Sequence, residues 1–440
     1  MPSFSGRFEY LASGRGAVQS GPCELSFDEE TVTIVPAGPP MAFDLGDIDV
    51  FQPGDYEIRL SLWTGHALRL THFAKAFQDL ERQLRDAYRD RLVKCLLVSD
   101  LDEVARFTGQ VDVASADRRC SGPAEIRLYE SNLAVLPDAA VGFQWRLADI
   151  DGVEFDERNY AVVFVQGGER LTVGRLAKRT GELADRVRSR ITALNQRTTR
   201  TLRALFPFLS PEQFPQVAAL MREGKSAPIA RLRSIHHLID SVLIDKVVDA
   251  ALKPYVKTLV ARSTAEGWYA GFKVIRQGAT DADAEGLPAD QAGGGGEEEE
   301  VEPDAWSRSL APAVLDAGAG LEVLYWFFFP IAARGGAPTH LAWEATSRGG
   351  RATYVFRLDP GQSLDAAVAE INRGLVSLNF RREPVYLDDR KLESELRYRH
   401  YAIAQRKVPE LGRVRRAFVG RAIHTSTDSW AKQFDALLSR

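Results

Sequence analysis

Two aspartate pairs are the residues whose type and spacing most directly suggest chemistry. The chain reads FDLGDIDVF at residues 43–51 and WRLADIDGVEF at residues 145–155, so Asp47 and Asp49 recur as Asp149 and Asp151. Paired carboxylates can serve general acid–base catalysis, but neither pair is accompanied in the sequence by the further residues that such a site needs. On a strand, both carboxylates of a pair would point to one face and the intervening Ile48 or Ile150 to the other. We therefore expect both pairs at a solvated strand edge, with the two isoleucines buried.

Histidines and cysteines offer no other site. His236 and His237 are adjacent, so on a helix they point about 100° apart and cannot form the i,i+4 pair of a helical zinc site. The three cysteines, Cys23, Cys95 and Cys120, form no CxxC motif. An odd, sparse set is typical of buried thiols in a reducing cytosol rather than of a disulfide framework. With no nucleophile or phosphate-loop motif either, we expect a protein that is not an enzyme and that uses no cofactor or metal.

An internal repeat explains why the aspartate pair occurs twice. Ser20-Gly21-Pro22 matches Ser121-Gly122-Pro123, Tyr56 matches Tyr160, and HALRLTHFAKAFQDL at 66–80 matches ERLTVGRLAKRTGEL at 169–183. The period is about 102 residues, and such self-similarity indicates a duplicated structural unit. The sequence thus predicts two copies of one fold, over residues 5–97 and 105–197.

Each copy has the same order of local patterns. Alternating stretches such as CELSF and TVTIV, or AEIRL and LAVL, predict about six or seven short antiparallel strands. One amphipathic helix ends each copy. The apolar faces of these helices are Phe73, Phe77, Leu80, Leu84 and Tyr88 in the first, and Leu176, Leu183, Val187, Ile191 and Leu194 in the second.

This order of elements resembles the pleckstrin-homology-like superfold, in which a bent antiparallel sheet forms a partly open barrel that a C-terminal helix closes. The resemblance covers residues 5–97 and 105–197 and depends on element order rather than on a diagnostic motif. It implies an α+β protein with two tandem modules of a kind that binds lipid headgroups, binds peptides or serves as structure.

The remaining chain predicts three further regions. Residues 198–262 are expected to form a basic helical connector, with Ser210 as the N-cap of one helix and Pro254 breaking or starting another. Residues 263–380 form an α+β domain, either a diverged third copy or a different fold, in which the aromatic run Tyr325–Phe329 is buried on both faces. It contains an acidic insert at 281–304, which we expect to be disordered. Residues 381–440 read as basic C-terminal helices.

Composition limits the partners. The 440-residue chain has a net charge of −4 and 45% apolar residues, which gives no overall nucleic-acid or membrane signal, and its start lacks the apolar core of a signal peptide. We expect a bacterial-type cytoplasmic scaffold that binds a protein partner through its tandem modules by strand addition. The alternative is recruitment to anionic membrane lipid, for which the first copy offers only Arg59 and Arg69. Nucleic acid is not expected as a partner.

Overall fold

The computed structural model describes residues 2–13, 16–114, 119–276, 321–333, 335–346 and 352–440. The acidic insert predicted at 281–304 lies outside these residues. By internal contacts the chain divides into two units, the first formed by Met1–Thr192 with Asp388–Pro409 and the second by Ala193–Leu387 with Glu410–Arg440. The two are described in turn.

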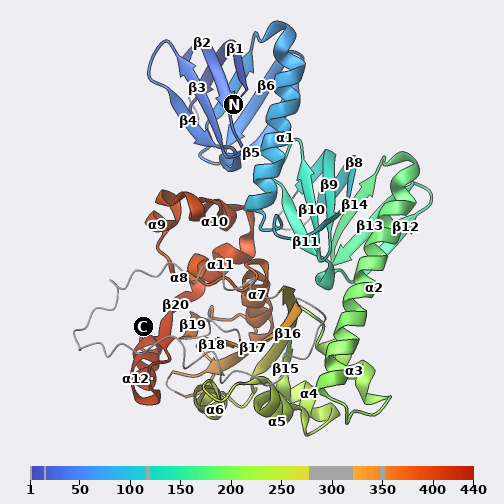
Figure 1. The fold of residues 1–440 in the computed structure, drawn as a ribbon, viewed down its shortest axis with the longest axis vertical. Coiled ribbons are helices and arrows are strands. Elements are labelled where there is room, and N and C mark those ends of the chain that lie inside the picture. Colours follow the sequence, from blue (N-terminus) through green and yellow to red (C-terminus); the bar gives the residue numbers. More distant parts are fainter. Residues whose placement is uncertain (1, 14–15, 115–118, 277–320, 334, 347–351) are drawn as a thin grey trace. The chain divides into compact units, whose positions relative to one another are not determined.

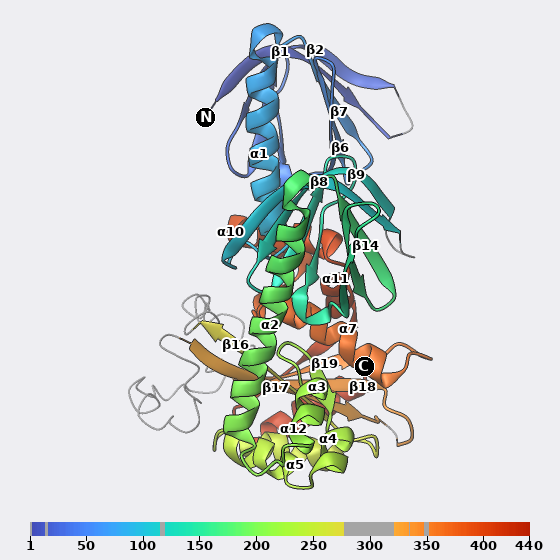
Figure 2. The same ribbon diagram turned by 90° about the vertical axis from the view of Figure 1, so that its right-hand side faces the viewer.

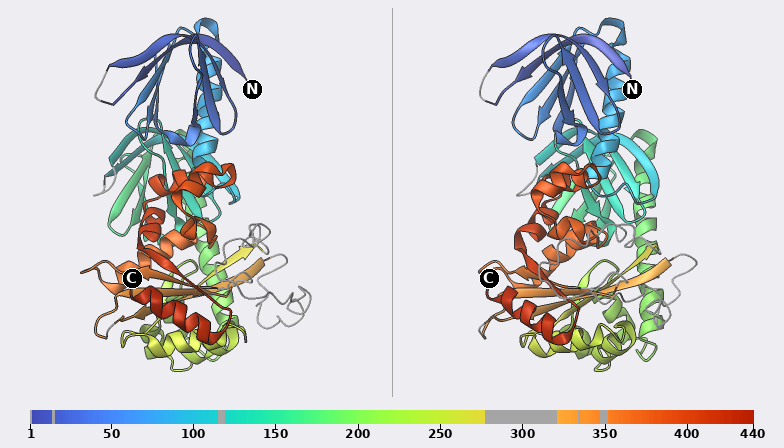
Figure 3. Two further views of the ribbon diagram at one scale, coloured as in Figure 1. Left: turned by 90° about the vertical axis from the view of Figure 1, so that its left-hand side faces the viewer. Right: turned by 60° about the vertical axis from the view of Figure 1, so that its left-hand side comes forward.

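The first unit contains two seven-stranded antiparallel sheets with the same strand order (Figure 1). The first sheet has the order β4-β3-β2-β1-β7-β6-β5 and the second β11-β10-β9-β8-β14-β13-β12. The two sheets thus share one strand order, as two copies of one fold would, and the sheet of the first copy curls strongly (Figure 3). The strands of the first copy are β1 (Ser3–Leu11), β2 (Ala17–Phe27), β3 (Thr31–Pro36), β4 (Met41–Asp44), β5 (Ile48–Gly54), β6 (Glu57–Leu62) and β7 (Ala67–Thr71). Those of the second are β8 (Glu103–Ala114), β9 (Arg119–Tyr129), β10 (Asn132–Pro137), β11 (Phe143–Arg146), β12 (Gly152–Asp156), β13 (Ala161–Gln166) and β14 (Glu169–Gly174).

A helix follows each sheet, as predicted. In the first repeat, α1 (Phe77–Cys95) runs along the sheet (Figure 2), and all five residues of its predicted apolar face are buried. The second is α2 (Thr180–Leu205). Burial of this face against alternating inward residues of the strands, such as Leu25 and Ile34, forms the core of the first repeat.

The aspartate pairs depart from the prediction. Ile48 and Ile150 are buried as expected, with 0% and 4% of their surface exposed. However, Leu45–Asp47 and Leu147–Asp149 are 3₁₀ turns, so Asp47 and Asp149 end a turn instead of lying on a strand. Their side chains are only 16% and 12% exposed, and the prediction of exposed pairs is wrong for these two residues. A tight turn, unlike a strand, can direct a carboxylate toward protein groups beside it.

Two helices from the C-terminal part of the sequence also belong to the first unit. They are α9 (Asp389–Ser394) and α10 (Leu396–Lys407), within the segment predicted as basic helices. Asp388 caps α9 by accepting a hydrogen bond from the backbone N–H of Lys391. Helix α10 packs against α1 and the 3₁₀ turn of the first repeat.

The second unit is built on a six-stranded antiparallel sheet with the order β15-β16-β17-β18-β19-β20. Helices of the connector and α12 cover one face, where Phe327 and Phe329 are buried, and α7 covers the other, where the Trp326 indole lies against Asn372 (Figure 3). The strands are β15 (Ser226–Pro228), β16 (Tyr269–Arg276), β17 (Leu321–Ile331), β18 (His340–Ala345), β19 (Ala352–Arg357) and β20 (Phe418–Ile423). The helices are α3 (Gln213–Leu220), α4 (Ile229–Ile235), α5 (Ile239–Val242), α6 (Lys253–Arg262), α7 (Leu364–Ser377), α8 (Glu383–Tyr386), α11 (Pro409–Ala417) and α12 (Thr427–Leu438).

This unit confirms some predictions and corrects others. The aromatic run Tyr325–Phe329 is buried on both faces of the sheet. Its strands follow each other as a meander, which differs from the order shared by the two repeats and favours a different α+β fold over a third copy. Residues 418–423, predicted as helix, form β20, because the exposed edge of β19 offers a backbone partner that local helix propensity does not foresee.

Candidate binding site on the first repeat

Three carboxylates of the first repeat hold one face of helix α10. Arg399 Nε lies 3.1 Å from Asp44 Oδ2, and Arg406 Nη2 lies 2.5 Å from Asp47 Oδ1. Lys407 Nζ donates to Asp49 Oδ1 at 3.0 Å and to the carbonyl of Ile48 at 2.9 Å, and its side chain is only 2% exposed. We call Asp44, Asp47 and Asp49, with the turn that carries them, the acidic recess.

Arg91 of α1 supports the recess from inside the repeat. Its Nε and Nη2 donate to the two carboxylate oxygens of Asp44 at 2.9 and 2.6 Å, and its Nη1 donates to Glu30 at 2.6 Å. The Arg91 and Asp44 side chains are 1% and 3% exposed, so this bidentate ion pair is fully desolvated. Burial raises the pKa of Asp47, in spite of the opposing charge of Arg406. The cations of α10, Arg406 first among them, oppose this effect and favour the ionised form of Asp47.

Apolar contacts complete the docking of α10. Gly46 leaves the space that α10 fills: a Cβ on Gly46 would lie 2.7 Å from Cys95 Sγ and 2.9 Å from Ile403 Cδ1. The guanidinium of Arg406 lies over the ring of Trp63, 4.2 Å from its centre. Cys95 is fully buried there, and burial raises the pKa of its thiol to about 12. Shape and charge thus both fit α10 to this turn.

The second repeat uses the matching residues differently. Arg146 stands where the first repeat has Asp44, and its Nη2 pairs with Asp149 at 2.6 Å. Asp151, the counterpart of Asp49, accepts a hydrogen bond from the backbone N–H of Gly167 at 2.8 Å. In the second repeat, Arg146 and Gly167 of the same repeat contact these two carboxylates, whereas in the first repeat Asp47 and Asp49 are contacted by a helix from elsewhere in the chain.

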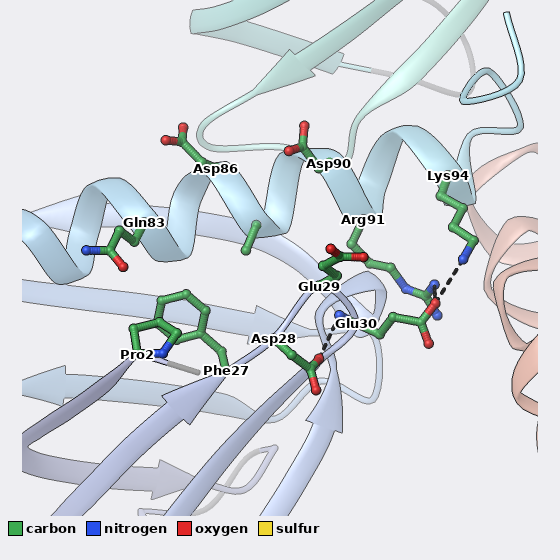
Figure 4. A pocket seen from close by; sticks show the side chains of 11 residues that line it. Pro2, Phe27, Asp28, Glu29, Glu30, Gln83, Asp86, Asp90, Arg91 and Lys94 are labelled. Carbon is green, nitrogen blue, oxygen red and sulfur yellow. Dashed lines mark hydrogen bonds and ion pairs between the residues drawn. The ribbon is translucent and has the colours of Figure 1, made fainter.

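A groove of about 660 Å³ opens beside the recess, between the β2–β3 turn and helix α1 (Figure 4). Asp28 shapes the turn, since its Oδ1 accepts from the backbone N–H groups of Glu30 and Thr31 at 2.8 and 2.7 Å. Residues at helical spacing on α1 form the opposite wall. The lining residues are Pro2, Phe27, Asp28, Glu29, Glu30, Gln83, Asp86, Ala87, Asp90, Arg91 and Lys94; we call this the acidic groove.

The charges of this groove are unevenly neutralised. Both of its cations, Arg91 and Lys94, pair with Glu30, at 2.6 and 2.9 Å. Within the part of the chain that the structure describes, Glu29 and Asp86 have no ion-pair or hydrogen-bond partner, and both are exposed. An apolar floor that includes Phe27 with unpaired carboxylates on the rim suits a ligand that carries both apolar and cationic groups.

The second repeat lacks such a groove lining. The counterparts of Asp28, Glu29 and Glu30 are Tyr129, Glu130 and Ser131, and those of Gln83, Asp86 and Ala87 are Arg186, Ser189 and Arg190. The second repeat thus has the same strand order as the first, although the corresponding face of α2 is basic instead of acidic. Asp28 and Glu30 have the structural contacts given above, whereas the second repeat forms the same strand order without acidic counterparts of Asp28 and Asp86.

Other residues singled out in the sequence are placed elsewhere. His236 and His237 lie in the break between α4 and α5, where their rings stack on each other with centroids 4.9 Å apart. The three cysteines are buried and unbridged. Arg69 pairs with Glu57 at 2.7 Å and Glu9 at 3.3 Å, which leaves little of its charge for a lipid phosphate. Over the described ranges, no three His, Cys, Asp or Glu side chains gather as metal ligands would.

Comparison with known proteins gives no relative: no protein-family model matches this sequence, and no curated protein matches it. None of the helices in the described parts of the chain is both long enough and apolar enough to cross a membrane.

Sequence reasoning missed the contact between the acidic recess and α10 because its two sides lie far apart in the sequence: Asp44 and Arg399 are separated by 355 residues. One signal was available. Four residues spaced i, i+4, i+7 and i+8 lie on one face of a helix, namely Arg399, Ile403, Arg406 and Lys407. The three cations among them indicate a face that can pair with carboxylates.

Proposed function

We propose that this chain is a non-catalytic binding or scaffolding protein with two pleckstrin-homology-like modules, and that the acidic groove of the first module holds a lysine- or arginine-bearing segment of a partner protein. The observation that carries the proposal is the groove itself, with its apolar floor and the unpaired carboxylates of Glu29 and Asp86. The same position in the second module is basic, which supports a specific role for these acids.

Elementary electrostatics favour a protein segment over a lipid headgroup. A phosphorylated headgroup needs several clustered cations, and the two cations of the groove are already paired with Glu30. A lysine or arginine side chain, by contrast, can lay its alkyl stem on Phe27 and Ala87 and direct its charge to Glu29 or Asp86. Such rim charges mainly set association rate and specificity, so binding should weaken as salt rises.

The test compares three full-length baits in affinity capture from the source cells. They are the unchanged protein, a groove variant with Glu29→Lys and Asp86→Lys, and a control with Glu157→Lys and Asp185→Lys. The control makes the same charge change on exposed side chains of the second repeat.

We expect a partner that the unchanged protein and the control retain and the groove variant loses. Its purified form should then bind the unchanged protein and the control directly, at least about tenfold more tightly than it binds the groove variant. Equal retention by all three baits would contradict the proposal. Co-sedimentation of all three with phosphatidylserine vesicles, without a protein partner, would favour the anionic-lipid alternative.

A further inference from the structure

We infer that the acidic recess is a binding site for a basic amphipathic helix of a partner protein, and that α10 is its occupant within the chain. This inference concerns a different surface from the acidic groove and does not depend on it. The side chains of the partner helix follow those of α10: an arginine at position i, an aliphatic residue at i+4, and cations at i+7 and i+8.

The first argument is that the fold does not need this contact. In the second repeat the same turn has the same backbone form, and Arg146 neutralises Asp149 within the turn. The first repeat has Asp44 at that position instead, which adds a third carboxylate and removes the local cation. Arg91 neutralises Asp44 from within the first repeat, so Asp47 and Asp49 are the carboxylates that take their cations from another segment.

The second argument is that α10 shows which ligand fits. Arg399, Ile403, Arg406 and Lys407 lie on one helical face and contact the recess through ion pairs, one backbone carbonyl and the space above Gly46. Ion pairs alone would accept any cationic segment. The aliphatic contact at Gly46 and the buried Lys407 Nζ require the fixed spacing of a helix.

The third argument is that α10 is tethered and that part of its contact is solvated, although Ile403 and Lys407 at the centre of the contact are buried. The side chains of Arg399 and Arg406 are 38% and 27% exposed, so water reaches the edge of this contact. The segments on both sides of Asp388–Pro409 belong to the second unit, so α10 is a tethered ligand. A tethered ligand acts at an effective concentration of about millimolar, which a free helix with higher affinity can overcome.

The experiment uses a labelled synthetic peptide of residues 388–409 and three full-length proteins. The first is unchanged, so its own α10 fills the recess. The second carries Arg406→Glu and Lys407→Glu, which repel α10 and leave the recess carboxylates intact. The third adds Asp47→Lys and Asp49→Lys to these changes. We expect fluorescence anisotropy to show at least about tenfold tighter peptide binding to the second protein than to the first, and none to the third.

Labelling of the three cysteines separates release of α10 from unfolding. Cys95 lies beside Ile403 under α10, whereas Cys23 and Cys120 belong to the two sheets. Release should expose Cys95 alone to a thiol reagent, and unfolding should expose all three. If the double variant unfolds, the single change Arg406→Gln replaces it, with Arg397→Gln on the exposed face of α10 as its control.

Three results would overturn the inference. The first is failure of the peptide to bind a variant in which Cys95 alone has become reactive. The second is equal binding of the peptide to all three proteins, which would indicate another surface. The third is a dimer of the unchanged protein that exchanges α10 between copies, because the occupant would then be a second copy of this chain.

Discussion

Removing the guanidinium of Arg91 should destabilise the first unit strongly. Arg91 bridges Asp44 and Glu30 through three hydrogen bonds of 2.6–2.9 Å, and the Asp44 carboxylate is 3% exposed. Arg91→Leu introduces the residue found at the matching position of the second repeat, Leu194, so the new side chain itself suits this fold. The change leaves a buried carboxylate whose remaining cation is the half-exposed Arg399.

The expected loss follows from the burial of this ion pair. Breaking a buried pair by removing one partner typically costs about 3–5 kcal/mol, because the other charge stays desolvated. For a unit of this size, 1 kcal/mol shifts the melting temperature by about 2–4 °C, so we expect a shift of roughly 6–20 °C. Adding Asp44→Asn removes the uncompensated charge and keeps an acceptor for the backbone N–H of Gly46, so it should recover about 1–3 kcal/mol.

Urea and thermal unfolding of the full chain, followed by circular dichroism, measure both effects. Arg82→Leu is the matched control, since Arg82 lies on the same helix, is 68% exposed and pairs with an equally exposed Asp79. Its loss should stay within about 0.5 kcal/mol. The reasoning fails if Arg91→Leu costs less than about 1 kcal/mol, or if the Arg91 and Asp44 changes add independently to within about 0.5 kcal/mol.

Three further outcomes are expected. Gly46→Ala should displace α10, because the new Cβ would lie 2.9 Å from Ile403 Cδ1. Cys95 should then react with thiol reagents while Cys23 stays protected, and unchanged protection of Cys95 would contradict this. Thr353→Val should destabilise the second unit by about 1–3 kcal/mol in urea, since the buried Trp430 Nε1 loses the acceptor that it reaches at 2.7 Å. An equal effect of Thr258→Val in α6, where the hydroxyl's hydrogen bond to the Pro254 carbonyl is exposed, would refute it. Burial and the charge of Arg357 lower the pKa of His340 below its usual 6.5, so its contribution to stability is present above about pH 6.5 and is lost as the pH falls through the lowered pKa. Unfolding of the His340→Phe variant should therefore depend less on pH in this window than unfolding of the unchanged protein, and an equal dependence would count against this assignment.

Local patterns were enough to predict the two repeats. The alternation of apolar and polar residues in the strands and the apolar faces of α1 and α2 depend on residues within about ten positions of each other, so they can be predicted from the local sequence. The strand β1 shows little alternation, because glycine and polar residues interrupt it in FSGRFEYL, although its pairing with β2 and β7 is extensive.

Contacts between segments that are distant in the sequence could not be predicted from local patterns. The strand β20 and the docking of α10 both join segments separated by tens to hundreds of residues, and local propensity carries no information about which distant edge or turn will receive them. The aspartate pairs illustrate the same limit. Their repetition indicated inheritance from a duplicated module, but it did not show that Asp44 and Arg146, at matching positions, contact different partners, Arg399 of α10 in one copy and Asp149 of the same turn in the other.

The central claim, that the first repeat binds a basic protein segment in its acidic groove, is tested most directly by crosslinking inside the source cells. A photoreactive amino acid is placed at Gln83, in the groove, and in a parallel protein at Arg186, the matching position of the second repeat. We predict that Gln83 crosslinks to one protein partner and that the attached peptide contains clustered lysine or arginine residues, while Arg186 does not crosslink to that partner. Crosslinks from Gln83 to lipid alone, or the same partners from both positions, would contradict the claim.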